Sequence, residues 1–131
     1  MNSKILIVED DASFGIMLQK WFERNDFLPV LCTEMHSAKE KLLKSSFDLV
    51  LSDLRLPDGD GIILLNWMKE RRLNTPVIIM TSYGEISTAV SAIKLGAADF
   101  LEKPLNPSVL KEKIETILRA PKPDENVSKK R

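Results

Sequence analysis

The stretch Lys4–Phe22, "KILIVEDDASFGIMLQKWF", joins two hydrophobic patterns and decides the fold. It begins with the continuous apolar run Ile5–Val8, which is typical of a strand buried on both faces. Acidic residues end this run, and apolar residues then recur at the spacing of one helix face: Phe14, Met17, Leu18, Trp21 and Phe22. The stretch therefore predicts a strand followed by a helix.

The same strand-then-helix unit recurs along the chain. Four further apolar runs are predicted as strands, over residues 28–32, 48–52, 77–80 and 98–101. Helical spacing follows them, over residues 35–42, 61–71, 86–93 and 107–118. Five such units predict an α/β fold with a parallel sheet covered by helices on both faces. Right-handed crossovers leave few topologies, and we expect the flavodoxin-like (βα)5 fold with strand order 2-1-3-4-5.

Length and composition limit the classes of function. The chain has 131 residues, enough for one domain, with 19 basic and 19 acidic residues. This balance argues against general affinity for nucleic acid or membranes. No apolar run is long enough to span a bilayer. A single cysteine, Cys32, cannot form an internal disulfide, so we interpret it as a small buried hydrophobic residue in a cytoplasmic protein.

The two ends of the chain differ in character. Residues 1–119 are predicted to form the domain. Residues 120–131, "APKPDENVSKKR", show no helical period and are predicted to be a flexible tail or the start of a linker.

Polar side chains stand at the ends of the predicted strands. The first strand leads to Asp10 and Asp11, the third to Asp53, the fourth to Thr81, and the fifth to Lys103. In parallel sheets the carboxyl ends of the strands share one edge, where ligands bind. Adjacent carboxylates there repel one another unless one is protonated or a cation neutralises them, and oxygen ligands suit Mg²⁺. One acid at a strand end is often only a helix cap, and Asp11 could serve in this way.

Together these groups indicate phosphoryl transfer. A carboxylate can attack phosphorus and form an aspartyl phosphate, while a metal ion and a lysine neutralise the phosphoryl oxygens. Asp53 is the best nucleophile because it stands alone at its strand end. Asp10 and Asp11 are the better metal ligands because they are adjacent. Lys103 and the Thr81 hydroxyl complete the catalytic set.

Four motifs carry a resemblance to a known family. In order and spacing they are similar to the receiver domain of bacterial two-component response regulators, over residues 3–118. The motifs are "ILIVEDD", "DLVLSDLRLPDGDG", "VIIMTSYG" and "ADFLEKPL".

The resemblance implies roles for individual residues. It implies that Asp53 is the phosphoacceptor and that Lys103 pairs with the phosphoryl group, next to a cis bond to Pro104. The implied magnesium ligands are Asp11, Asp53, Asp10 acting largely through water, and the main-chain carbonyl of Arg55. The remaining implied roles are the switch hydroxyl Thr81, the switch aromatic Phe100, and the positions Arg55 and Tyr83 that tune phosphate lifetime.

The resemblance also implies partners. The domain would be a signalling switch and not an enzyme, and a sensor histidine kinase would donate the phosphoryl group. The stretch "VIIMTSYGEISTAVSAIKLGAADFLEKPL" is most similar to the receivers of nitrogen-regulator-like transcription activators, which usually continue into an ATPase and a DNA-binding domain. Phosphorylation in such proteins either promotes a homodimer through the last two helices or releases an inhibitory one.

Two other classes are compatible with a strand-end aspartate on this fold. A haloacid-dehalogenase-like phosphatase needs a second acid two residues after the nucleophile. Arg55 occupies that position here, which argues against this class. A flavin or nucleotide carrier needs a glycine-rich phosphate loop after the first strand. This chain has acids there, which repel phosphate and argue against this class.

Overall fold

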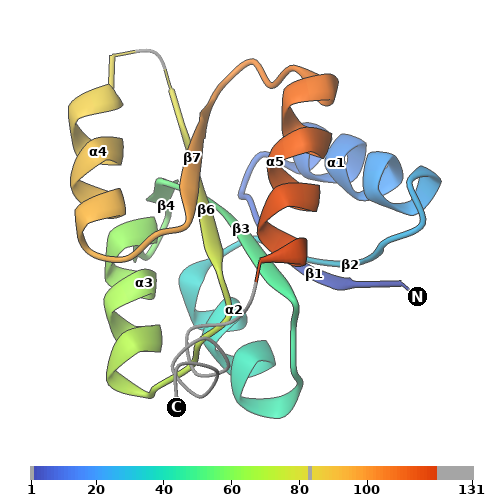
Figure 1. The fold of residues 1–131 in the computed structure, drawn as a ribbon. Coiled ribbons are helices and arrows are strands. Elements are labelled where there is room, and N and C mark those ends of the chain that lie inside the picture. Colours follow the sequence, from blue (N-terminus) through green and yellow to red (C-terminus); the bar gives the residue numbers. More distant parts are fainter. Residues whose placement is uncertain (1, 83, 121–131) are drawn as a thin grey trace, which may run out of the picture.

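The computed structural model describes residues 2–82 and 84–120, and the predicted tail from residue 121 onward lies outside them. Within the described residues, five strands run parallel in one sheet of order β2-β1-β3-β6-β7 (Figure 1). These strands are β1 (Lys4–Val8), β2 (Leu28–Cys32), β3 (Leu49–Asp53), β6 (Val77–Thr81) and β7 (Asp99–Glu102). The order is the predicted 2-1-3-4-5, because the intervening β4 and β5 lie outside this sheet.

Five helices of the described chain cover both faces of the sheet, as predicted. They are α1 (Ala12–Arg24), α2 (Met35–Lys44), α3 (Gly61–Glu70), α4 (Ile86–Lys94) and α5 (Pro107–Arg119). Figure 1 shows α1 and α5 on one face and α2, α3 and α4 on the other. Two helix ends have favourable caps: Asn106 accepts from the N–H groups of Ser108 and Val109, and Gly96 follows α4 with φ of 114°.

Alternate residues of each strand serve the two hydrophobic cores. Ile5 and Ile7 pack with Phe22 and Leu110 under α1 and α5. Leu6 and Val8 pack with residues of α2 and α3 on the opposite face. Both faces are therefore apolar, which explains the continuous apolar runs in the sequence. Cys32 is buried, and burial raises the pKa of its thiol to about 11, in agreement with the predicted hydrophobic role.

A short antiparallel hairpin, β4 (Arg55–Leu56) and β5 (Gly59–Asp60), was not predicted. It lies between β3 and α3 and carries Asp58 at its turn. Asp60 caps α3 by accepting from the N–H of Ile63 at 2.8 Å. Gly61 begins α3 so close to β3 that an added Cβ would lie 3.0 Å from the carbonyl oxygen of Asp53. The absence of a side chain at Gly61 therefore lets the hairpin return beneath the end of β3.

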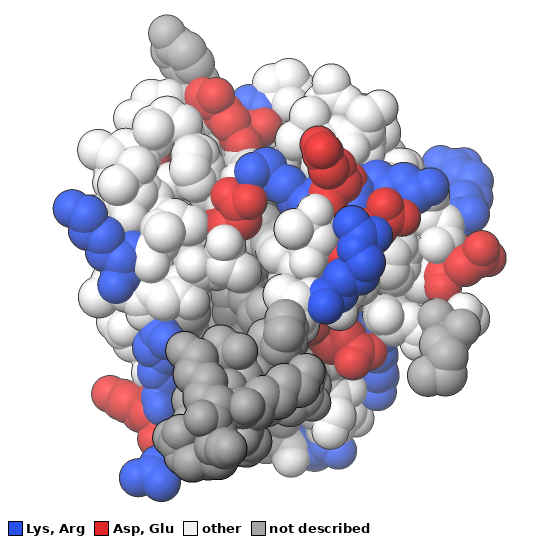
Figure 2. Space-filling model, viewed as in Figure 1, with Lys and Arg blue, Asp and Glu red and all other residues white. Residues whose placement is uncertain are grey.

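No helix within the described ranges is long and apolar enough to cross a membrane. Basic and acidic side chains intermingle on the face seen in Figure 2, consistent with a formal net charge of zero.

Candidate functional site

The register of the sheet brings the strand ends together at one edge. Val8 of β1 lies opposite Ser52 of β3, and Asp53 lies opposite Met80 of β6. Glu9, the residue after β1, is therefore beside Asp53, and Thr81 follows on the other side. Glu9 and Asp53 are both buried, with exposed fractions of 1% and 7%. Two neighbouring carboxylates with so little solvent need a cationic partner.

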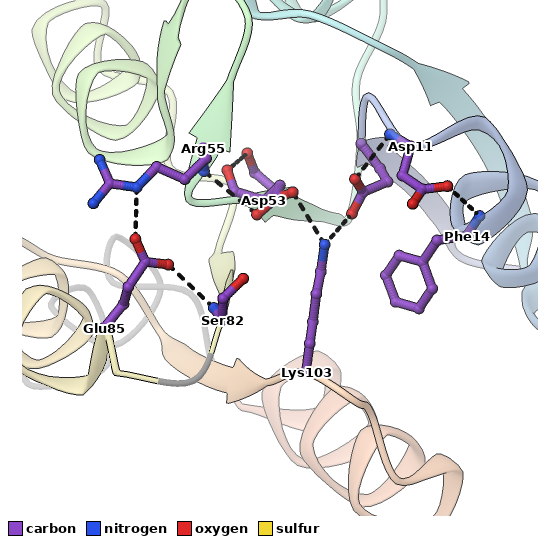
Figure 3. Close-up of polar contacts among 9 residues, drawn as sticks. Asp11, Phe14, Asp53, Arg55, Ser82, Glu85 and Lys103 are labelled. Carbon is purple, nitrogen blue, oxygen red and sulfur yellow. Dashed lines mark hydrogen bonds and ion pairs between the residues drawn. The ribbon is translucent and has the colours of Figure 1, made fainter.

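Lys103 supplies that partner from the turn after β7. Its Nζ lies 2.8 Å from Glu9 Oε1 and 3.1 Å from Asp53 Oδ2, and it joins the two carboxylates (Figure 3). Its backbone N–H donates to the carbonyl of Thr81 at 2.8 Å, and the Lys103–Pro104 bond is cis, as predicted. The ammonium group also lies 4.7 Å from the centre of the Phe14 ring. Lys103 thus bonds to residues at the ends of three strands, β1, β3 and β6.

Burial and the neighbouring hydrogen bonds have opposite effects on the pKa values of Glu9 and Lys103. Burial raises the pKa of Glu9, and the nearby Asp53 adds to the rise, while hydrogen bonds from Lys103 and from the Asp11 N–H reduce it. Burial alone would lower the pKa of Lys103, but its hydrogen bonds to Glu9 and Asp53 outweigh that effect and raise it. Lys103 therefore stays charged at neutral pH.

Among the described residues, the carboxylates of Glu9, Asp10 and Asp53 offer oxygen atoms within 4.8 Å of one another, and we call this set the carboxylate cluster. Asp10 is exposed, so the cluster is open to solvent on one side. Several carboxylate oxygens on a partly solvated rim are the donor set that Mg²⁺ prefers. The residues present therefore fit the predicted metal ion.

The structure places Asp11 elsewhere. Asp11 Oδ1 accepts from the N–H of Phe14 at 3.0 Å and caps α1. Its own N–H donates to Glu9 Oε2 at 3.1 Å. The structure thus brings Glu9, Asp10 and Asp53 together, whereas the predicted ligands were Asp10, Asp11 and Asp53. Asp11 stands immediately before the first residue of the helix and caps it. Glu9 was missed, although its position directly after the strand was visible in the sequence.

Arg55 begins at the acceptor and points away from it. Its N–H lies 3.4 Å from Asp53 Oδ1, but its side chain extends to Glu85, where Nε and Oε2 are 2.6 Å apart. Its main-chain carbonyl remains a predicted metal ligand. Tyr83, the other predicted tuning residue, lies outside the described residues.

The two predicted switch residues occupy different environments. Thr81 is completely buried, and its Oγ1 has no hydrogen-bond partner among the described residues. Phe100 of β7 is half-buried and packs against the core on the side of α2 and α3. A buried hydroxyl without a partner is costly, so Thr81 is ready to donate to an acceptor arriving at this edge.

Known proteins with similar sequences are response regulators and transcriptional regulators. The family described as "Response regulator receiver domain" matches residues 5–115. The response regulator protein PilR of Pseudomonas aeruginosa is 38% identical over 123 residues, which are 94% of this chain and 28% of PilR. The transcriptional regulatory protein FixJ of Bradyrhizobium diazoefficiens is 38% identical over 119 residues, 91% of this chain and 58% of FixJ.

Solved structures agree with these relatives. NtrX from Brucella abortus superposes with a TM-score of 0.89 at 30% identity, over 100% of this chain and 30% of NtrX. The chain therefore spans less than two thirds of the length of these proteins. With a fold, a site edge and a family match that agree, the chain belongs to the receiver domains of two-component response regulators.

Proposed function

We propose that this domain takes a phosphoryl group from a phosphohistidine of a sensor kinase onto Asp53 and thereby controls an output, which we take to be transcription. The observation that carries the proposal is the environment of Asp53. It is a buried carboxylate at a strand end, 3.1 Å from a lysine ammonium and within the carboxylate cluster. This combination of nucleophile, cation and metal-type ligands suits phosphoryl transfer.

Phosphoryl transfer would form a bond from Asp53 to phosphorus and break the bond from phosphorus to the kinase histidine. A carboxylate oxygen of Asp53 attacks phosphorus in a phosphohistidine whose other ring nitrogen carries a proton. The P–N bond breaks, and its electron pair stays on the imidazole nitrogen, leaving a neutral imidazole. The product is an acyl phosphate on Asp53. Water later attacks that phosphorus, which releases inorganic phosphate and restores the carboxylate. Lys103 neutralises negative charge beside Asp53 throughout.

Magnesium is the proposed cofactor. Glu9, Asp10 and Asp53, with the carbonyl of Arg55, would hold it, and it would neutralise charge on phosphoryl oxygens. In this chain Glu9 also holds Lys103 at 2.8 Å, so it orients the lysine as well as serving the metal site. Asp11 is left out of this ligand set because its carboxylate caps α1.

The switch uses the hydroxyl and aromatic residues described above. A phosphoryl oxygen on Asp53 gives Thr81 Oγ1 the acceptor that no described residue supplies. Movement of Thr81 vacates space into which Phe100 can rotate, and this changes the surface of α4, β7 and α5. In thermodynamic terms the phosphoryl group selects a minor conformation that already exists.

The output side is proposed from the relatives. PilR and FixJ are named as regulators and are longer than this chain, which supports an output domain elsewhere in the protein, such as an ATPase with a DNA-binding domain. The α4 surface is a candidate for a phosphorylation-linked homodimer in the cytoplasm. Three apolar residues of α4 are exposed: Ile86, Val90 and Ile93.

Uptake of phosphate from acetyl phosphate tests the proposal. Intact-mass spectrometry should show one added phosphoryl group with Mg²⁺ and none with EDTA. Asp53→Asn should remove the adduct because the nucleophile is gone, and Lys103→Met should slow its formation by about a hundredfold, as for loss of one charge-stabilising group. An adduct of equal yield in Asp53→Asn would refute the assignment.

A further inference from the structure

We propose that Glu85 is an internal competitor of the phosphoryl group. Its carboxylate holds two donors at the rim of Asp53, the guanidinium of Arg55 and the N–H of Ser82, and yields them when Asp53 is phosphorylated. The proposal rests on the proposed function above and adds a positioning residue to it.

The contacts of Glu85 define the competitor. Glu85 stands immediately before α4, and its Oε2 accepts from Arg55 Nε at 2.6 Å. Its Oε1 accepts from the backbone N–H of Ser82 at 3.2 Å. Both oxygens of one carboxylate are thus engaged by donors from two different segments (Figure 3).

Both donors belong to the edge that holds Asp53. The backbone N–H of Arg55 points to Asp53 Oδ1 at 3.4 Å, so its side chain starts beside the acceptor. Ser82 is two residues beyond Met80, the residue that pairs with Asp53 in the sheet. In Figure 3 Arg55 and Glu85 lie on one side of Asp53, and Lys103 lies on the other. A group attached to Asp53 would therefore extend towards donors that Glu85 already occupies.

Charge and burial suit Glu85 to this role. Its pKa is lowered, first by the hydrogen bond from Arg55 and then by that from Ser82, so the carboxylate is negative at neutral pH. The Glu85 side chain is 19% exposed, whereas that of Arg55 is 66% exposed and has room to turn. A phosphoryl group carries more charge and more acceptor oxygens than a carboxylate. Once attached to Asp53, the phosphoryl group should therefore accept hydrogen bonds from the Arg55 guanidinium and the Ser82 N–H in place of Glu85.

Loss of these bonds has a consequence at the switch surface. Glu85 precedes Ile86, the first residue of α4, and it makes no side-chain cap to that helix. When Arg55 and Ser82 leave it, the start of α4 loses two tethers. The competition thus couples the charge on Asp53 to the helix whose surface we propose for dimerisation.

Titration with beryllofluoride in the presence of Mg²⁺ tests the proposal, because this complex mimics a phosphoryl group on aspartate. Glu85→Gln keeps the size of the side chain but removes its charge, and it should tighten beryllofluoride binding by about tenfold because charge-assisted bonds no longer compete. In an Arg55→Gln background the gain from Glu85→Gln should shrink. The amide resonance of Ser82 should shift in Glu85→Gln towards its position in the beryllofluoride complex.

Glu102→Gln is the matched control. Glu102 is exposed and pairs with Thr81 in the sheet, so it lies at the same edge, but it contacts no described residue through an ion pair. Its neutralisation should change affinity less than twofold, because only long-range charge is lost. Equal affinity of Glu85→Gln and the parent protein, or weaker binding with a lower melting temperature, would overturn the competitor role. Absence of binding by the parent protein would refute the proposed function itself, and the competitor role with it.

Discussion

Three consecutive acids at the end of β1 have three different environments. Glu9 is 1% exposed and paired with Lys103, Asp10 is exposed within the carboxylate cluster, and Asp11 caps α1. The chain turns from strand to helix within these residues, so each side chain points in a new direction. A shift of one residue therefore changes the role of a carboxylate completely.

Neutralising Asp10 and Asp11 separately checks this division of roles. Asp10→Asn should weaken Mg²⁺ binding by about tenfold or more, because one charged ligand is lost. Without metal it should raise the free energy of unfolding by about 1 kcal/mol, since it relieves repulsion inside the cluster. Asp11→Asn should leave Mg²⁺ affinity nearly unchanged, because the Asp11 carboxylate caps α1 and lies outside the carboxylate cluster. The fold should also be retained, because asparagine caps a helix as well as aspartate does.

Thermal unfolding with and without Mg²⁺ measures both quantities. Only Asp10→Asn should lose the stabilisation by Mg²⁺. A loss of Mg²⁺ affinity in Asp11→Asn as large as that in Asp10→Asn would restore Asp11 to the metal site.

The sequence predicted Asp11 as a metal ligand, whereas the structure has Glu9 in the carboxylate cluster. The apolar run ends visibly at Val8, so a carboxylate at this place was predictable. Two of the three adjacent acids, Glu9 and Asp10, enter the cluster, and which two do so depends on where the helix starts. Capping competes with metal binding for the same residue type, and the sequence offers no signal that separates them.

At the scale of elements, the β4–β5 hairpin supports α2 as well as α3. Asp58 at its turn accepts from the N–H groups of Met35 and His36 at 2.8 and 2.9 Å. Glu34, at the N-cap position of α2, makes no side-chain cap. The start of α2 is therefore capped by a residue more than twenty positions later in the chain. This links the segment that follows Asp53 to a helix on the same face.

Removal of this remote cap should destabilise the fold. Asp58→Ala should lower the free energy of unfolding by about 1–2 kcal/mol, as loss of a good helix cap does, and Asp58→Asn by less because one acceptor remains. Glu34→Ala serves as the control and should cost under about 0.5 kcal/mol. Urea unfolding at pH 7 measures these differences.

The effect should depend on pH in a defined direction. Slight desolvation would raise the pKa of Asp58, but the N–H groups of Met35 and His36 outweigh it and lower the pKa below 3.8. The ionised cap therefore contributes fully above that pH and is lost as pH falls through the lowered value. The difference between the parent protein and Asp58→Asn should narrow below about pH 3.8. A difference that stayed constant as the pH fell would show that the charge of Asp58 plays no part, and one that grew with acidity would contradict the lowered pKa.

Most elements were predictable and the hairpin was not. Each strand of the main sheet and each helix has enough residues to show its period, and the predicted bounds lie close to those observed. Strands of two residues, such as Arg55–Leu56, have no period to detect. The cap of α2 by Asp58 was equally invisible, because it joins residues distant in sequence.

At the scale of the whole molecule, the site exists only when the fold is complete. Lys103 reaches Glu9 across 94 positions of sequence and Asp53 across 50. The order of the strands places β1, β3 and β6 side by side, and both faces of the sheet are sealed by helices. Convergence of strand ends at one edge was predictable from the parallel topology. The pairing of Lys103 with Glu9 was not, since it depends on side-chain directions.

Chemical trapping of the acyl phosphate tests the central claim most directly. After reaction with acetyl phosphate and Mg²⁺, borohydride reduces an aspartyl phosphate to homoserine, and peptide sequencing by mass spectrometry locates the change. We predict homoserine at residue 53 alone, and none when the protein is first unfolded in urea. Homoserine at residue 10 or 11, or labelling that persists in the unfolded chain, would contradict a fold-assembled acceptor at Asp53.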